Sequence, residues 1–158
     1  MNITKIIFLD IDGVLNNQLW YVATKGERAD PVTGKRIMDD IDPGSVEFLN
    51  MLIEKTGAKV VVSSTWRLGK TVEELQEILN RNGFKGEVIG KTENLRGTGI
   101  VRGNEIFHWI ETNENIIGCD SYKYNNYVIL DDDSDMLLWQ KDNFINTDPY
   151  CGLTPNDV

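Results

Sequence analysis

Three short runs of consecutive apolar residues stand out along the chain, at positions 6–9, 60–62 and 127–130. Each run is bounded by polar residues, which is typical of a strand buried on both faces of a parallel sheet. Positions 88–89 form a shorter strand candidate, and positions 144–145 a possible edge strand. The pattern therefore predicts a small sheet whose inner strands are fully buried.

Between these runs, apolar residues recur every three or four positions, which predicts helices. The first predicted helix covers 42–57, where an aspartate caps the start, a proline follows in the first turn and a glycine ends it. The second covers 71–83 and opens on the capping box Thr71-x-x-Glu74. A third covers 104–110. Strands and helices thus alternate along the chain.

This alternation predicts an α/β fold, a three-layer Rossmann-like arrangement with a mostly parallel central sheet and helices on both faces. The 158 residues are the size of one domain, so we expect a single domain over 1–158. Positions 16–41 are the least regular stretch, and long irregular loops in compact domains are usually functional. We interpret 16–41 as a flap or minimal cap. Positions 152–155 fit either the start of a last helix or a loop.

Composition is ordinary for a globular protein, with 41% apolar and 26% charged residues. No apolar run approaches the roughly 20 residues of a membrane span, and the first residues show no secretory signal pattern. The two cysteines, Cys119 and Cys151, follow no disulfide or metal pattern. We therefore expect a cytoplasmic protein with no membrane partner, present as a monomer or weak dimer. A formal net charge of −9 lowers the expectation of broad nucleic-acid binding without removing it.

Two acidic pairs follow predicted strands. Asp10 and Asp12 come directly after the first strand, and Asp131 and Asp132 follow the strand at 127–130. If these strands lie side by side and parallel, the four carboxylates meet at one edge of the sheet, where α/β folds bind ligands. Carboxylate oxygens suit Mg²⁺, which usually takes one or two protein carboxylates together with phosphate oxygens. The sequence therefore predicts a magnesium site that serves phosphate chemistry.

Residues two apart in an extended strand point to the same side, so Asp10 and Asp12 can face one phosphoryl group together. One carboxylate can attack phosphorus while the other protonates the leaving oxygen and later deprotonates a water molecule. Gly13 lets the chain turn sharply, so that the backbone can curl around a small anion. A solvated turn at a strand end is the competing explanation of this short motif.

A second polar loop follows the strand at 60–62. Ser63, Ser64 and Arg67 lie in this loop and are candidates to bind a phosphoryl group, whereas a capped strand-to-helix turn is the structural alternative. Arg102 precedes the third predicted helix and can offset charge that builds on the phosphoryl oxygens. Arg96 and Lys91 compete with it for this role, and the pattern does not separate them.

Other phosphate-transfer mechanisms find little support. His108 is the only histidine and lies in a predicted helix without a motif around it, neither cysteine has the arginine that a thiolate phosphatase needs, and there is no Walker-type loop. A signalling receiver module would place its acceptor aspartate at the end of a middle strand, where this chain has Ser63. In the flap, Trp20, Tyr21, Lys25 or Arg28 could contact substrate, although packing of the two aromatic rings on the body is the simpler expectation.

Taken together, the chain resembles the haloacid dehalogenase-like (HAD) superfamily of aspartate-nucleophile phosphatases. The residues that carry the resemblance are, in chain order, Asp10-Ile11-Asp12-Gly13-Val14, Ser63, Arg102, and Asp131-Asp132 with Asp135 following. The wider string, with 63–67, 102–110 and 152–154, is similar to the small capless branch of that superfamily. That branch includes domains associated with RNA-repair proteins.

The resemblance implies a role for each matching residue. Asp10 would be the nucleophile that forms an aspartyl-phosphate, and Asp12 the general acid and then the general base. Ser63 would bind the phosphoryl group, and Arg102 would steady both the nucleophile and the transferring phosphate.

The resemblance also implies a Mg²⁺ ligand set. The ion would be held by the Asp10 carboxylate, the backbone carbonyl of Asp12 and one carboxylate of the last motif. Members with a glycine before the metal-binding aspartate place that aspartate at the second position of the pair, which favours Asp132 over Asp131 as the direct ligand. Asp135 would support the site.

Two further features of the resemblance concern the substrate. Dehalogenase members lack an aspartate two residues after the nucleophile, so Asp12 implies hydrolysis of a phosphate ester. Members that act on small metabolites often carry a large cap, whereas here only 16–41 is inserted, which implies an open site. We therefore expect a phosphomonoester phosphatase whose partner is a phosphorylated small molecule or a nucleic-acid end. A non-catalytic phosphate- or metal-binding module is the alternative from another class.

Overall fold

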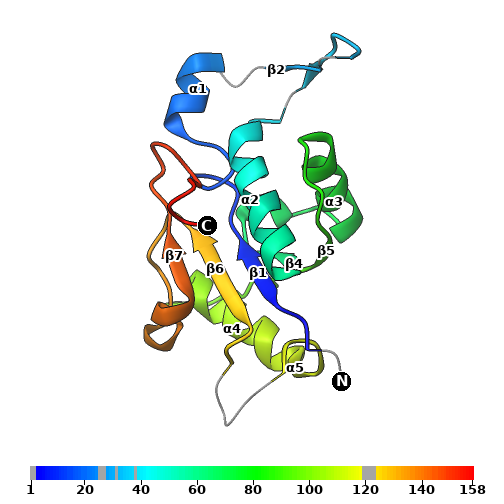
Figure 1. Ribbon diagram of the computed structural model, residues 1–158. Coiled ribbons are helices and arrows are strands. Elements are labelled where there is room, and N and C mark those ends of the chain that lie inside the picture. The colour runs from blue at the N-terminus through cyan, green and yellow to red at the C-terminus, as the bar shows by residue number, and fades with distance from the viewer. Residues whose placement is uncertain (1–2, 25–27, 31, 38, 119–123) are drawn as a thin grey trace.

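The computed structural model describes residues 3–24, 28–30, 32–37, 39–118 and 124–158. Its centre is a five-stranded parallel sheet with the strand order β5-β4-β1-β6-β7 (Figure 1). The strands are β1(Ile6–Leu9), β4(Lys59–Val62), β5(Val88–Lys91), β6(Tyr127–Asp131) and β7(Phe144–Asn146). The predicted parallel sheet is confirmed, and the strand at 144–146 lies at an edge, as expected.

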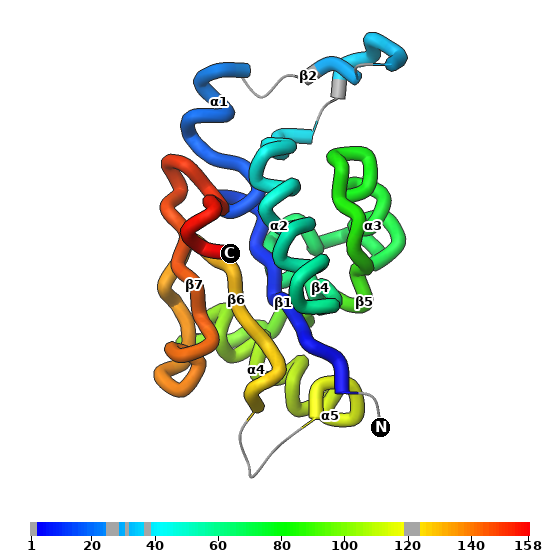
Figure 2. The backbone as a smooth tube through the Cα atoms, in the orientation of Figure 1, coloured from blue at the N-terminus to red at the C-terminus, as the bar shows by residue number. Residues whose placement is uncertain are grey.

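Helices cover both faces of this sheet. On one face, Ile7 and Leu9 of β1 pack with apolar residues of α2(Pro43–Thr56) and α3(Val72–Arg81). On the other face, Ile6 and Phe8 pack with α4(Arg102–Thr112) and α5(Glu114–Ile117). Successive side chains of a strand point to opposite faces, so one short apolar run supplies both cores. The predicted three-layer α/β fold is confirmed (Figures 1 and 2).

Local signals account for two of the helix starts. The side chain of Asp42 accepts a hydrogen bond from the Gly44 N–H at the start of α2, and α3 opens on the predicted capping box between Thr71 and Glu74. α4 begins at Arg102, two residues before the predicted start. The N–H groups of Arg102 and Gly103 are instead satisfied by Asp135, which lies beyond β6. This start depends on a tertiary contact that periodicity does not register.

Within the 16–41 segment, the described residues are more regular than expected. They form α1(Gln18–Thr24) and a two-stranded hairpin of β2(Arg28–Ala29) and β3(Arg36–Ile37), and this small insertion extends beyond α2 (Figure 1). Tyr21 is 53% exposed, so the expectation that it packs on the body is wrong. Trp20 is half-buried. Lys25 lies outside the described residues, as does Cys119.

The last described stretch, 147–158, is a loop with turns and no further helix. Cys151 is a free thiol. Leu153 is buried, and its N–H donates to the carbonyl of Val14, in the turn that follows β1. The tail therefore packs against the first acidic motif. Among the helices that the structure describes, none has the length and apolar character needed to cross a membrane.

Candidate active site

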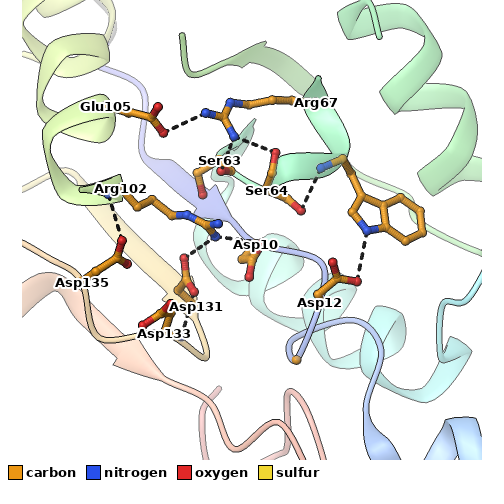
Figure 3. Close-up of polar contacts among 12 residues, drawn as sticks. Asp10, Asp12, Ser63, Ser64, Arg67, Arg102, Glu105, Asp131, Asp133 and Asp135 are labelled. Atoms are coloured by element: carbon orange, nitrogen blue, oxygen red, sulfur yellow. Dashed lines mark hydrogen bonds and ion pairs between the residues drawn. The ribbon is translucent and has the colours of Figure 1, made fainter. Parts of the chain in front are cut away.

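Register places the functional loops side by side. Leu9, the last residue of β1, pairs with Val62 of β4 on one side and with Leu130 of β6 on the other. The next residues along the three strands are Asp10, Ser63 and Asp131, so they meet at the carboxyl edge of the sheet (Figure 3). Parallel strands make this edge the usual ligand site of an α/β fold.

Three carboxylates gather at this edge. One oxygen from each of Asp10, Asp131 and Asp132 can be chosen so that all three lie within 4.8 Å of one another. Asp10 and Asp131 are buried, and Asp132 is partly exposed. Like charges this close repel strongly in a partly desolvated place, so the arrangement calls for a cation.

Arg102 supplies one positive charge. Its Nη1 lies 2.9 Å from Asp10 Oδ1 and 2.8 Å from Asp131 Oδ2, so a single guanidinium nitrogen joins the two acidic motifs. Of the other two candidates, Arg96 is exposed, and the Lys91 ammonium donates to the backbone carbonyl of Lys70. Asp135 fixes the arginine by accepting a hydrogen bond from its backbone N–H, at 3.1 Å. Of the three cationic side chains between which the sequence could not choose, Arg102 is therefore the one that contacts the carboxylate cluster.

The pKa shifts at this edge show an excess of negative charge. Burial, and next the charge of Asp10, raise the pKa of Asp131 to about 7, although Arg102 works in the opposite direction. Burial and Asp10 also raise the pKa of Asp132. Burial opposes the charge of Arg102, but Asp10 and Asp131 more than offset it, so the pKa of the arginine is raised. One arginine does not balance these carboxylates.

Asp12 differs from the other acids because it is exposed and lies on the open side of the edge. Its Oδ1 accepts two hydrogen bonds, one from Asn16 Nδ2 at 2.8 Å and one from the indole Nε1 of Trp66 at 3.1 Å. Asn16 is itself fixed, because its Oδ1 accepts from the Gly13 N–H at 2.9 Å. The two donors orient the Asp12 carboxylate and leave Oδ2 as the oxygen that can exchange a proton with a ligand.

Ser63 has an unsatisfied polar atom. It is 0% exposed, and its Oγ has no hydrogen-bond partner among the described residues. Buried hydroxyl groups are nearly always paired, and an orphan points to a missing partner such as a bound ligand. The position beside Asp10 fits a phosphoryl oxygen as that partner.

Two residues that the sequence predicts as substrate contacts support the loop instead. Ser64 is fully buried, and its Oγ caps the short 3₁₀ helix η1(Thr65–Arg67) by accepting from the Trp66 N–H. Arg67 is 4% exposed and donates to the carbonyls of Ser63, Ser64 and Thr92. Its Nη2 pairs with Glu105 Oε2 at 2.7 Å. With its donors used in this way, Arg67 holds the loop that presents Ser63.

Gly13 acts through its shape. Its φ is +76°, and an added Cβ would lie 2.3 Å from the Asp132 Cγ, far inside contact distance. Its N–H donates to Asn16 Oδ1, so this N–H is already paired and Gly13 contributes to the site through its backbone turn. Only glycine allows this turn and the close approach of Asp132 together.

The last residue of β7 and the residue that follows it hold the acidic loops in place. Thr147 Oγ1 donates to the Gly13 carbonyl at 2.8 Å, and Asn146 Nδ2 donates to the Asp132 carbonyl at 2.9 Å. These supports, like Trp66 and Glu105, carry no recognisable sequence signal, because their partners lie far away along the chain. Only Asn16, at the end of the first motif, is near enough in sequence to be suspected.

The donor set of this edge fits a hard divalent cation. Three carboxylates converge, burial and next the charge of Asp10 raise the pKa of two of them, and a buried hydroxyl beside them lacks a partner among the described residues. Asp131 is engaged at both oxygens, by Arg102 and by the Asp133 N–H, whereas Asp132 lies against Gly13. Asp10 and Asp132 are therefore the carboxylates most available to an ion.

The fold and this arrangement of acids are those expected of a HAD-like domain. A family model described as the HAD domain in Swiss Army Knife RNA repair proteins matches residues 6–158. The chain belongs to this family. Comparisons with curated proteins and with solved structures give no significant match. Membership supports a phosphatase-like hydrolase function.

Proposed function

We propose that this protein is a Mg²⁺-dependent phosphomonoester phosphatase that works through an aspartyl-phosphate on Asp10. The observation that carries the proposal is the bridge from Arg102 to Asp10 and Asp131, with Asp132 in the same carboxylate cluster. This bridge joins three of the four sequence motifs, and the pairing of β1 with β4 brings Ser63, of the remaining motif, to the same edge of the sheet. The family to which the chain belongs supports the same class of reaction.

In the first half-reaction, a carboxylate oxygen of Asp10 attacks phosphorus, and the bond between phosphorus and the ester oxygen breaks. Asp12 donates a proton from Oδ2 to the leaving oxygen, so an alcohol departs. Trp66 and Asn16 keep the other oxygen of Asp12 occupied during this transfer. In the second half-reaction, Asp12 accepts a proton from a water molecule, and the water oxygen attacks phosphorus and releases phosphate from Asp10.

Ser63 and Arg102 act on the transferring group. The Ser63 hydroxyl donates to a phosphoryl oxygen, which satisfies the orphan Oγ. Arg102 restrains the Asp10 oxygen with which it pairs, and it offsets negative charge on the phosphoryl group. Arg102 is held by Asp10, Asp131 and Asp135 before substrate arrives, so little reorganisation of this donor is needed.

Asp10, the Asp12 carbonyl and Asp132 are the groups that would hold Mg²⁺. Charge on the carboxylates and on the phosphoryl oxygens would be neutralised there by the ion when bound. Asp131 then serves as the partner that positions Arg102.

The test is phosphate release from p-nitrophenyl phosphate, nucleotides, sugar phosphates and phosphorylated oligonucleotides, with Mg²⁺ and with EDTA. Asp10→Asn should abolish metal-dependent release, whereas Asp142→Asn, an exposed acid of the 3₁₀ helix η2(Leu138–Asn143), should match wild type. Asp12→Asn should accumulate phosphoenzyme when the leaving group is good. Unchanged turnover in Asp10→Asn contradicts the mechanism, and no release from any substrate indicates a phosphate- or metal-binding module.

A second candidate is the same chemistry at a 5′ or 3′ nucleic-acid end. The description of the family, as a domain of RNA repair proteins, favours it. The small size of the 16–41 insertion also leaves room for an extended substrate. In the substrate panel, preference for oligonucleotides over mononucleotides would select this candidate.

A further inference from the structure

A cleft of about 430 Å³ is lined by Asp12, Thr65, Trp66, Lys70 and Arg81, together with Asp39 and Ile78. It lies beside the carboxylate cluster and shares only Asp12 with the groups assigned to the reaction. Asp12 is the proposed proton donor to the leaving oxygen, so the leaving group must lie on its side of the transferring phosphate. The cleft is therefore the space that a large leaving group would enter.

The charges along this cleft are unevenly compensated. Asp39 accepts hydrogen bonds from Arg81 Nη2 at 2.8 Å and from Asn82 Nδ2 at 3.0 Å, so its charge is largely offset. Lys70 is half-buried, and among the described residues its ammonium group forms no ion pair. Its one hydrogen bond runs to the Trp66 carbonyl at 3.2 Å. In a chain of net charge −9, Lys70 thus keeps a positive charge at the cleft that no described carboxylate offsets, and an anion bound in the cleft can pair with it.

Trp66 connects the cleft to the reaction. Its indole Nε1 is bonded to Asp12, while the residue also lines the cleft, so the ring is held in a defined position next to the proton donor. A fixed aromatic wall near a cation suits a nucleotide unit, because a base can stack on the ring and a phosphate can pair with the ammonium group.

We propose that this cleft is the leaving-group subsite, and that Lys70 binds a phosphodiester next to the phosphomonoester that is cleaved. The inference rests on the proposed phosphatase function and makes Lys70 a specificity-determining residue for it. A phosphorylated end of a nucleic-acid strand carries this pair of groups, whereas a mononucleotide or p-nitrophenyl phosphate does not.

The test compares substrates that differ in one phosphodiester. Values of kcat/KM are measured for uridine 3′-monophosphate against the 3′-phosphorylated diuridylate, and for uridine 5′-monophosphate against the 5′-phosphorylated diuridylate. Wild type should favour the dinucleotide about tenfold at one end, as expected of a partly exposed ion pair. Lys70→Gln removes the charge but keeps a donor for the Trp66 carbonyl, and it should reduce the preference to about twofold or less.

Two matched variants control for indirect effects. Lys70→Arg keeps the charge and should retain most of the preference. Lys55→Gln removes an exposed lysine from the last turn of α2 that does not line the cleft, and this variant should behave as wild type. Added KCl should weaken the preference in wild type more than in Lys70→Gln, because salt screens the pair.

Binding to Asp10→Asn protein, measured by calorimetry with the same four substrates, separates the two proposals. If p-nitrophenyl phosphate is hydrolysed and Asp10→Asn abolishes this, the phosphatase function stands whatever Lys70 does. Tighter binding of a dinucleotide that Lys70→Gln removes supports the subsite even if turnover is absent. Equal affinity for mono- and dinucleotides at both ends, or a preference that survives Lys70→Gln, overturns it.

Discussion

Arg67 and Arg102 are both largely buried and both belong to the region around the start of α4, where Arg102 is the first residue of the helix and Arg67 pairs with Glu105 one turn on. Their surroundings are nevertheless opposite. Arg67 is satisfied by three backbone carbonyls and by Glu105, all of which belong to the body of the domain. Arg102 instead pairs with Asp10 and Asp131, in a cluster that keeps more negative charge than it balances. A supporting side chain such as Arg67 is thus fully paired, whereas a side chain of the site such as Arg102 lies among carboxylates whose charge it only partly offsets.

Arg67→Met should have the largest effect and tests whether Arg67 is a supporting residue. Removing the guanidinium leaves Glu105 as a buried, unpaired carboxylate, and we expect a loss of about 3–5 kcal/mol in the free energy of unfolding. Urea unfolding followed by circular dichroism measures it. The double variant Arg67→Met with Glu105→Met should recover part of the loss, because no lone charge remains. A loss below about 1 kcal/mol would contradict a supporting role.

Arg102→Met should separate activity from stability. We expect kcat to fall about 100- to 1000-fold, as when a fixed donor to the transition state is removed. The loss in unfolding free energy should be smaller than in Arg67→Met when Mg²⁺ is in excess, because a cation can replace the lost charge beside Asp10 and Asp131. Steady-state kinetics and urea unfolding with Mg²⁺ test both parts. Equal stability losses in the two variants would count against the comparison.

The same contrast applies to two glycines with similar backbones. Gly13 has φ +76° and Gly57, which ends α2, has φ +67°, but only at Gly13 would a Cβ meet the Asp132 carboxylate. Each alanine variant should lose about 1–2 kcal/mol of stability through the left-handed backbone. Gly13→Ala should in addition weaken Mg²⁺ binding at least tenfold by displacing Asp132. Calorimetric titration with Mg²⁺ compares them, and equal Mg²⁺ affinity would refute a role for the close approach.

The smallest expected effect is a gain in stability on substitution of Asp132. Folding raises the pKa of Asp132, so its charge costs stability at a pH above the folded pKa, and the cost disappears as the pH falls through that value. Asp132→Asn should therefore stabilise the metal-free protein at pH 8 by a few tenths to about 1 kcal/mol, with solvent screening included. The gain should shrink at acidic pH. Thermal unfolding in EDTA measures it, and Mg²⁺ should raise the Tm of the variant less than that of wild type.

Much of the fold could be predicted from local pattern. The apolar runs located the strands, and the caps at Asp42 and Thr71 located two helices, because these signals act within a few residues. The predictions for the 16–41 segment and for the start of α4 were less accurate. The hairpin within 16–41 has only two residues per strand, and the first turn of α4 is held by Asp135, which lies beyond β6.

For the site, the type and order of the residues could be read from the sequence, but the burial and the partners of each side chain could not. The sequence placed Asp10, Ser63 and Asp131 at strand ends, and the sheet register joins them. It could not distinguish Arg102 from Arg96 and Lys91, nor see that Arg67 is enclosed, because burial and partners depend on the whole fold. The hydrogen bond from the indole N–H of Trp66 to Asp12 joins residues 54 positions apart, and no local sequence pattern predicts it.

The hydrogen bond from Thr147 to Gly13 joins residues 134 positions apart, and Leu153 likewise binds Val14. During synthesis the first acidic motif leaves the ribosome early, whereas the residues that fasten its loop emerge among the last of this domain. The nascent chain can therefore assemble β1, β4 and the helices between them while Gly13 and Asp132 still lack their fixed arrangement. Metal affinity and turnover should thus arise in a late step of folding, after the hydrophobic layers have formed.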